Sequence, residues 1–185
     1  MEEIEMMQNI IEKGVAMNQE LVSKYEKILP DEFMNIWRNY GLGSMYNGYI
    51  KIINPDEFQE LLNETYFRGK VSVPILVTAF GDIITIEEEQ YIGMVKYKNG
   101  SFGMLAANFN RFMQNLTEDY YMKKYFQISQ YTEAVKRLGE LEHDECFGYV
   151  PLLGLGGSEK VDNLDKVKIR EHIELISQMV GNIGM

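Results

Sequence analysis

The middle of the chain carries two consecutive β-hairpin patterns, which constrain the fold more than any other feature. The apolar run VPILVTAF (73–80) predicts a buried strand, and Gly81–Asp82 separates it from IITIEE (83–88). A two-residue break that begins with glycine is typical of a tight hairpin. A second hairpin is predicted around Asn99–Gly100, because Asn-Gly is a favoured hairpin turn. The EEE run, Glu87–Glu89, is interpreted as a solvated strand end.

A further strand is expected at Tyr49–Ile53, so the pattern predicts a mainly antiparallel sheet of about five strands. Helical spacing of apolar residues appears on both sides of this region. The predicted helices occupy LPDEFMNIWRNYG, NPDEFQELLNETY, NFNRFMQNL, SQYTEAVKRLG and DNLDKVKIREHIELISQMVG. In the last of these, Asp162 or Asn163 is expected to cap a long helix with Ile169 and Ile173 on its apolar stripe. Strands in the middle and helices at both ends of the chain indicate an α+β fold.

Charge and composition restrict the classes of partner. The 185 residues include 28 acidic and 18 basic side chains, which gives a net charge of −10. Nucleic-acid binding proteins need cations that replace the counterions of phosphates, so direct binding to nucleic acid is disfavoured, as is binding to an anionic membrane. We expect a cytoplasmic protein, because the N-terminal residues are acidic, an apolar run of membrane-spanning length is lacking, and Cys146 is the only cysteine.

The glycine-rich stretch GLGGSEK, Gly154–Lys160, raises the question of a phosphate-binding loop. A Walker A loop has lysine followed by Ser or Thr directly after its last glycine, but Ser158 and Glu159 stand there. A dinucleotide fingerprint has a third glycine where this chain has Glu159, whose carboxylate would repel a phosphate. We therefore interpret Gly154–Gly157 as a tight turn between a strand and the last helix, and we expect no cofactor.

Catalytic and metal chemistry also find little support in the sequence. One cysteine and two histidines cannot form a structural zinc site without carboxylates, and no metal is expected. His143 and Cys146 are close enough in sequence to suggest a cysteine nucleophile, but Cys146 adjoins an aromatic and apolar run that is typical of a buried cysteine. His172 lies beside the apolar stripe of the last helix and is interpreted as half-buried. The sequence thus predicts a protein without enzymatic activity.

Two stretches of the chain resemble known families. Leu29–Leu62 resembles the GAD-like domain, in which an amphipathic helix, a turn rich in Gly and Tyr, a strand and an Asn-Pro-Asp-Glu helix start follow in this order. Asp144–Gly181 is similar to the C-terminal domain of the type VI secretion immunity protein Tdi. The Phe-Gly-Pro-Pro-like opening of GAD-like domains is replaced here by IIEKGVAMNQE (10–20). The resemblance implies a GAD-like domain at 1–112 and an immunity C-terminal domain at 113–185, closely packed.

This resemblance implies a bacterial immunity protein that neutralises a secreted DNase toxin by direct binding. A nuclease needs a basic surface to hold DNA, so an acidic protein is a physically reasonable inhibitor. We expect carboxylates and a buried aromatic side chain to contact the toxin, with Asp144, Glu145, Tyr149 and Glu159 as the candidates. The alternative is a non-catalytic module that binds a small ligand between the sheet and the last helix, near Gly154–Gly157. The sequence leaves the oligomeric state open.

Overall fold

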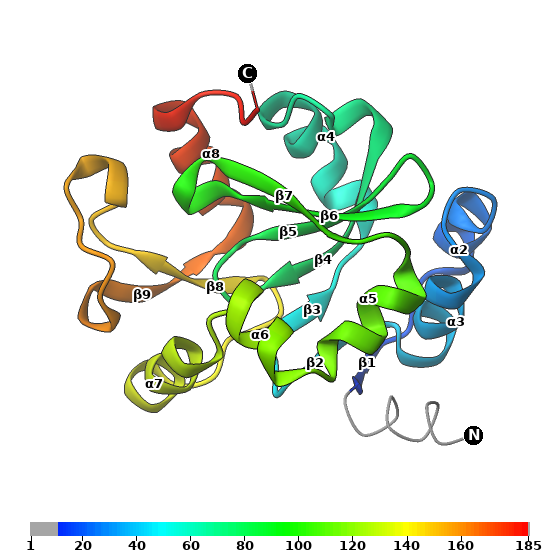
Figure 1. Ribbon diagram of the computed structural model, residues 1–185, viewed down its shortest axis with the longest axis horizontal. Coiled ribbons are helices and arrows are strands. Elements are labelled where there is room, and N and C mark those ends of the chain that lie inside the picture. The colour runs from blue at the N-terminus through cyan, green and yellow to red at the C-terminus, as the bar shows by residue number, and fades with distance from the viewer. Residues whose placement is uncertain (1–10, 185) are drawn as a thin grey trace.

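A computed structural model describes residues 11–184 of the chain, and its centre is a seven-stranded sheet (Figure 1). The acidic N-terminal residues, which are one reason to expect a cytoplasmic protein, lie outside the described residues. Every strand pairs antiparallel with the next one along the chain. The strands are β1 (Ile11–Val15), β2 (Leu42–Met45), β3 (Ile50–Ile52), β4 (Ser72–Thr78), β5 (Ile83–Glu87), β6 (Tyr91–Lys96) and β7 (Ser101–Ala106).

The α+β fold and the antiparallel sheet are confirmed, although the sheet has two strands more than the five expected. The additional strands are β1 and β2, which are short and interrupted by glycine. Such segments carry little period-two signal, so only their pairing partners reveal them.

Both predicted hairpins form, with longer turns than a two-residue loop. Four residues join β4 to β5, and Gly81 has a φ of +75° that L side chains rarely adopt. A further tight turn follows β5, where Glu88 and Glu89 have φ of 51° and 61°. The interpretation of Glu87 as a solvated strand end is wrong. Its carboxylate is buried and accepts hydrogen bonds from the Tyr66 hydroxyl at 2.8 Å and from Arg68 Nε at 2.6 Å.

The two helices predicted before the central strands form, and the second begins where its capping residue predicts. In α3 (Asp31–Tyr40) Phe33 and Trp37 are buried. In α4 (Pro55–Thr65) the side chain of Asn54 accepts a hydrogen bond from the amide of Asp56. Asn54 therefore satisfies one of the amides that a helix start leaves without a partner. A short helix, α2 (Gln19–Tyr25), precedes both.

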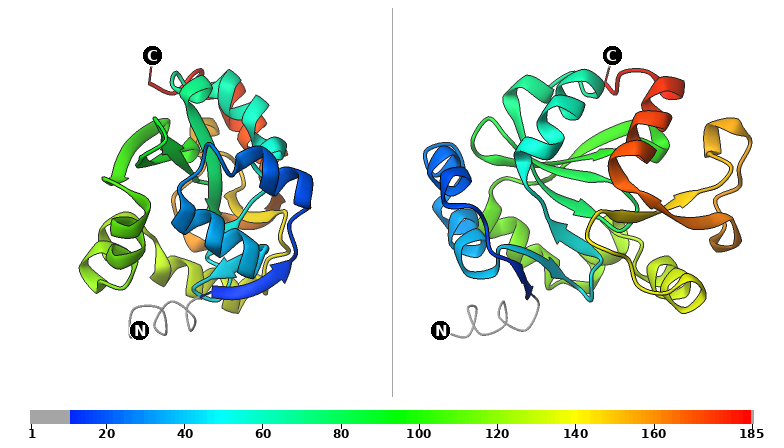
Figure 2. Two further views of the ribbon diagram at one scale, coloured as in Figure 1. Left: turned by 90° about the vertical axis from the view of Figure 1, so that its right-hand side faces the viewer. Right: turned by 180° about the vertical axis from the view of Figure 1, so that it is seen from behind.

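The two faces of the sheet carry separate apolar clusters. Ile84 and Met94 point to the larger cluster, which includes buried residues of α3, α5 (Phe109–Leu116), α6 (Asp119–Tyr125) and α7 (Ile128–Leu138). Ile83 and Val95 point to the second cluster, which α4 and α8 (Ile169–Val180) cover from behind (Figure 2). A sheet that is covered on both faces needs apolar residues at successive positions, which explains the continuous apolar runs of β4 and β5.

The C-terminal third differs from expectation in one element. The segment from Asp162 was predicted to be the start of the last helix, but it contains a strand, β9 (Leu164–Lys168). This strand pairs antiparallel with β8 (Glu145–Tyr149) to form a separate two-stranded ribbon, and α8 follows directly. Leu164 and Val167 have a helix-like spacing, and only the pairing with β8 makes the segment a strand. Among the described residues, none of the helices combines the length and apolar character that crossing a bilayer requires.

Candidate functional site

The helices α4 and α8 and the loop 139–144 that leads into β8 form one continuous side of the molecule (Figure 2). At one end the His143 ring nitrogen Nε2 lies 3.0 Å from the carbonyl oxygen of Ile52, just before α4. The amide of Ile169, the first residue of α8, donates to the carbonyl of Asp144 at 3.0 Å. At the other end Asn182 Nδ2 donates to the carbonyl of Glu64 at 3.3 Å. The two helices therefore run side by side in the same direction, with the loop at their N-terminal ends.

This side of the molecule carries a strong excess of negative charge, and we call it the acidic face. Four exposed bases lie on it or at its border. Lys24 of α2 is 2.6 Å from a carboxylate oxygen of Asp56, and Lys166 donates to the carbonyl of Glu140 at 2.9 Å. The other two are Lys168 and Arg170. Its exposed carboxylates belong to Asp56, Glu57, Glu60, Glu64, Glu140, Glu142, Asp144, Glu171 and Glu174. Such a concentration of one sign of charge attracts a basic protein and accelerates its association.

Two of the sequence-predicted residues, Asp144 and Glu145, lie together on the acidic face. Lys168 Nζ lies 2.8 Å from a carboxylate oxygen of Asp144 and 3.6 Å from one of Glu145. The hydrogen bond from Lys168 lowers the pKa of Asp144, which keeps this exposed carboxylate charged. Glu145 is less accessible, because its other oxygen accepts a hydrogen bond from the amide of Glu142 at 3.0 Å. Asp144 is thus the more accessible of the two carboxylates.

The position of the acidic loop depends on a residue that sequence reasoning missed, Lys51 of β3. Its side chain is buried, and Nζ donates to the carbonyl oxygens of Glu142 at 2.5 Å and Glu145 at 2.6 Å. Burial lowers the pKa of Lys51 to about 8. The one available signal is a lysine inside the apolar strand YIKII, where a charged residue has to find partners.

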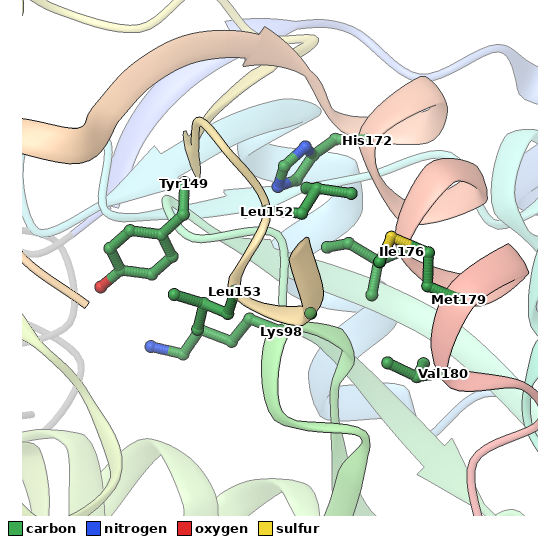
Figure 3. Close-up of a pocket in the computed structure, with 9 residues that line it drawn as sticks. Lys98, Tyr149, Leu152, Leu153, His172, Ile176, Met179 and Val180 are labelled. Carbon is green, nitrogen blue, oxygen red and sulfur yellow. The ribbon is translucent and has the colours of Figure 1, made fainter. Parts of the chain in front are cut away.

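Tyr149 and Glu159 are placed elsewhere, at the far end of β8. Tyr149 was expected to contact the partner, but only 3% of its surface is exposed, and its hydroxyl accepts a hydrogen bond from Gln130 Nε2 at 2.7 Å. Glu159 lies 3.3 Å from Lys98 Nζ. Lys98 also donates to Gln127 and lies 5.9 Å from the centre of the Tyr149 ring (Figure 3). Tyr149 therefore has a structural role, because its ring packs inside the protein where a partner cannot reach it.

The glycine-rich turn borders a very small cavity between Lys98, Tyr149 and α8 (Figure 3). Its volume of about 20 Å³ is enough for roughly one water molecule. Gly156 has a φ of +87°, and a Cβ on Gly157 would lie 2.0 Å from the carbonyl oxygen of Pro151. These two glycines serve the path of the backbone, and the cavity, which Gly154 lines, is too small for a nucleotide.

The candidate nucleophile Cys146 and the histidine His172 are both buried in the structure. Cys146 is fully buried, and burial raises the pKa of its thiol to about 12, which disfavours the thiolate form. His172 is more buried than expected, at 7% exposure, and burial lowers its pKa. Within residues 11–184, no group of three His, Cys, Asp or Glu side chains has the proximity that a metal ion needs.

Comparisons with known proteins agree with the two resemblances seen in the sequence. Residues 2–99 match the family model of the GAD-like domain, and residues 106–180 match that of the T6SS immunity protein Tdi1, C-terminal. No curated protein matches the chain. Among solved structures, the crystal structure of Atu4351 from Agrobacterium tumefaciens is similar in fold, with a TM-score of 0.77 and 17% identity over 91% of this chain and 84% of that one. The chain therefore belongs to the GAD-like family and carries in tandem a C-terminal region of the kind found in type VI secretion immunity proteins.

Proposed function

We propose that this protein is an immunity protein that binds a cognate toxin and blocks it, and that the toxin is a basic nuclease. The observation that carries the proposal is the acidic face of α4, the loop 139–144 and α8. A nuclease binds DNA through cations placed opposite phosphates, and the carboxylates of the acidic face can occupy the same positions. Bound there, the protein would cover the surface that the nuclease uses for DNA or for catalysis.

The match to the immunity C-terminal region supports this reading independently of charge. That region supplies five of the nine exposed carboxylates of the acidic face, including Asp144, Glu171 and Glu174, and α4 of the GAD-like region supplies the other four. Buried Lys51 of the GAD-like region holds the loop in place. Both regions therefore contribute carboxylates to the proposed binding surface, and the first region also positions the loop through Lys51.

The first test measures binding between the purified protein and the nuclease encoded beside its gene, together with the rate of DNA cleavage. We expect tight binding and loss of cleavage at low salt. Affinity should fall as salt is added, because screening weakens attraction between exposed charges. The proposal is wrong if the protein neither binds nor inhibits that nuclease at low ionic strength. If the affinity does not depend on salt, binding does not rest on the acidic face.

A matched pair of variants locates the surface. Glu171→Lys with Glu174→Lys reverses two exposed charges of α8, one in its first turn and one in its middle. Asp119→Lys with Glu133→Lys makes the same change in net charge on α6 and α7, outside the acidic face. We expect the α8 variant to weaken binding by roughly tenfold or more, with a slower association rate, and the control to retain nearly full affinity. Equal weakening by the two variants would show that the net charge acts without a defined surface.

A further inference from the structure

The last strand of the sheet, β7, has an open edge that is unusually apolar. It pairs with β6 on one side, and the sheet ends on the other. Among the described residues, no backbone hydrogen bond joins Ser101–Met104 to a segment other than β6. Phe102 and Met104 are 44% and 47% exposed, and the sequence of the strand, SFGMLA, contains no charged residue.

The opposite edge of the same sheet is protected in the usual ways. The edge strand β1 carries Glu12 and Lys13 on its exposed surface, and its register shifts between Glu12 and Val15. Charged residues and bulges on edge strands prevent pairing with another chain. β7 has a register shift of its own at Leu105, between the pairs that Met104 and Ala106 form with β6, but Ser101–Met104 is regular and has neither charge nor proline. An exposed strand of this kind is prone to pair with another chain.

Side chains beside β7 extend the apolar surface. Phe102 lies opposite Val95 and Met104 lies opposite Gly93 in the register of β6 and β7, so both point to the α4 side of the sheet. The ring of Phe67, which is 46% exposed, lies 5.1 Å from the ring of Phe102. Tyr91, 39% exposed, is on the same face of β6. We call Phe67, Tyr91, Phe102 and Met104 the edge patch. Exposed aromatic and methionine side chains that gather in this way are typical of the centre of a protein interface.

The charge distribution indicates what covers the edge patch. The protein has a net charge of −10, so two copies repel each other over most of their surfaces. β7 is an uncharged strand at which two copies can approach without this repulsion. An antiparallel pair of identical strands is also self-complementary about a two-fold axis. A basic toxin, in contrast, gains no electrostatic attraction from an uncharged strand, and the acidic face serves it better.

We propose that β7 pairs with β7 of a second copy of this chain. The two strands run antiparallel across a two-fold axis, and they join the two sheets into one. The edge patches of the two copies pack against each other beside this junction. The dimer does not depend on the proposed immunity function, because β7 lies outside the acidic face.

The test measures the mass of the full-length protein in solution by light scattering and sedimentation over a wide concentration range. We expect twice the chain mass of 21.5 kDa at high concentration and the chain mass on dilution. Met104→Lys places a charge in the centre of the proposed junction and should give the chain mass throughout. Because Met104 is half exposed, the melting temperature of the diluted protein should change little. Tyr120→Lys, at a side chain that is 75% exposed on α6, is the control and should remain dimeric.

Hydrogen exchange of the β7 amides provides a second measurement that does not depend on a variant. Exchange should slow as the concentration of the wild-type protein rises, because pairing protects these amides. A single chain mass at every concentration would overturn the proposal, as would a dimer that persists in both Met104→Lys and Phe102→Lys. Protection of β7 only after the toxin is added would also overturn it, since the strand would then bind the toxin.

Discussion

At the scale of single residues, the structure contains charged side chains at positions where water cannot reach them. Asp82 in the turn between β4 and β5 is 4% exposed, and its Oδ1 atom has no hydrogen-bond partner in the described residues. Burial raises the pKa of this carboxyl group to about 6, and attraction to Lys98 and Lys96 offsets only part of this effect. The charged form of Asp82 is therefore unfavourable in the folded protein.

We predict that Asp82→Asn stabilises the protein above neutral pH. Because the folded-state pKa of about 6 exceeds the unfolded value of 3.8, the carboxyl group favours folding below pH 3.8 and loses this contribution as the pH rises through 6. Asparagine remains neutral, so the free energy of unfolding should increase by about 1–3 kcal/mol above neutral pH. Urea unfolding at several pH values measures this difference, which should disappear in acid. A loss of stability above neutral pH would show that the charge of Asp82 stabilises the fold.

Buried charges of this kind could not be predicted from the sequence. Lys51, Asp82 and Glu87 are flanked by residues that give no indication of their partners. Lys51 donates to a carbonyl 91 positions away in the chain, so its environment exists only after folding. The exposure of Asp144, in contrast, could be predicted, because this acid lies among charged residues at the start of the stretch that resembles the immunity C-terminal domain.

At the scale of secondary-structure elements, the close packing of α8 against β8 requires a glycine at position 148. A Cβ atom on Gly148 would lie 2.5 Å from the ring of His172 in α8 and 2.7 Å from Val167 in β9. The fully buried Cys146 and Phe147 precede this position in β8, so the strand cannot easily move away. The glycine therefore allows the ribbon and the helix to pack at this distance.

We predict that Gly148→Ala lowers the free energy of unfolding by about 1–3 kcal/mol, because inserting a methyl group into a packed site forces the neighbouring groups to shift. Adding His172→Ala should recover part of this loss, since the ring is the closest neighbour of the new methyl group. Gly156→Ala is a useful comparison, because it has open space but a φ of +87° and tests backbone strain alone. The packing explanation is wrong if His172→Ala and Gly148→Ala act additively.

The elements that could be predicted are those with local signals. Asn54 and Pro55 mark the start of α4, and Asn-Gly marks the turn after β6. β9 was predicted as helix because the positions of Leu164 and Val167 fit a helical stripe, while the register with β8 is set by contacts across the fold. The acidic face could not be predicted from the sequence for the same reason. Each of its helices could be predicted alone, but their parallel arrangement beside the loop 139–144 could not.

At the scale of the whole molecule, each of the two apolar clusters contains residues of both family regions. The larger cluster contains buried residues from Ile11 to Leu164. The amide of Phe147 in β8 donates to the carbonyl of Ala79 at 2.7 Å, and the amide of Gln127 donates to the hydroxyl of Tyr49 at 2.9 Å. Near the C-terminus, Ile183 forms a bridge with Tyr66 after α4. The regions 1–112 and 113–185 are therefore proposed to unfold together.

Phe147→Ala tests this proposal on the full chain. The ring of Phe147 is buried and lies 6.3 Å from that of Phe80 and 6.0 Å from that of Tyr131, so its removal leaves a cavity where the two regions meet. We expect a loss of about 3–5 kcal/mol in the free energy of unfolding, with one transition retained. Native-state hydrogen exchange should show an equal loss of protection in α3 of the first region and in α8 of the second, because a cooperative unit opens as a whole. If α3 retains its protection while α8 loses it, the GAD-like region is stable on its own. The acidic face would then join a stable region to one that opens separately, and toxin binding would change how they are coupled.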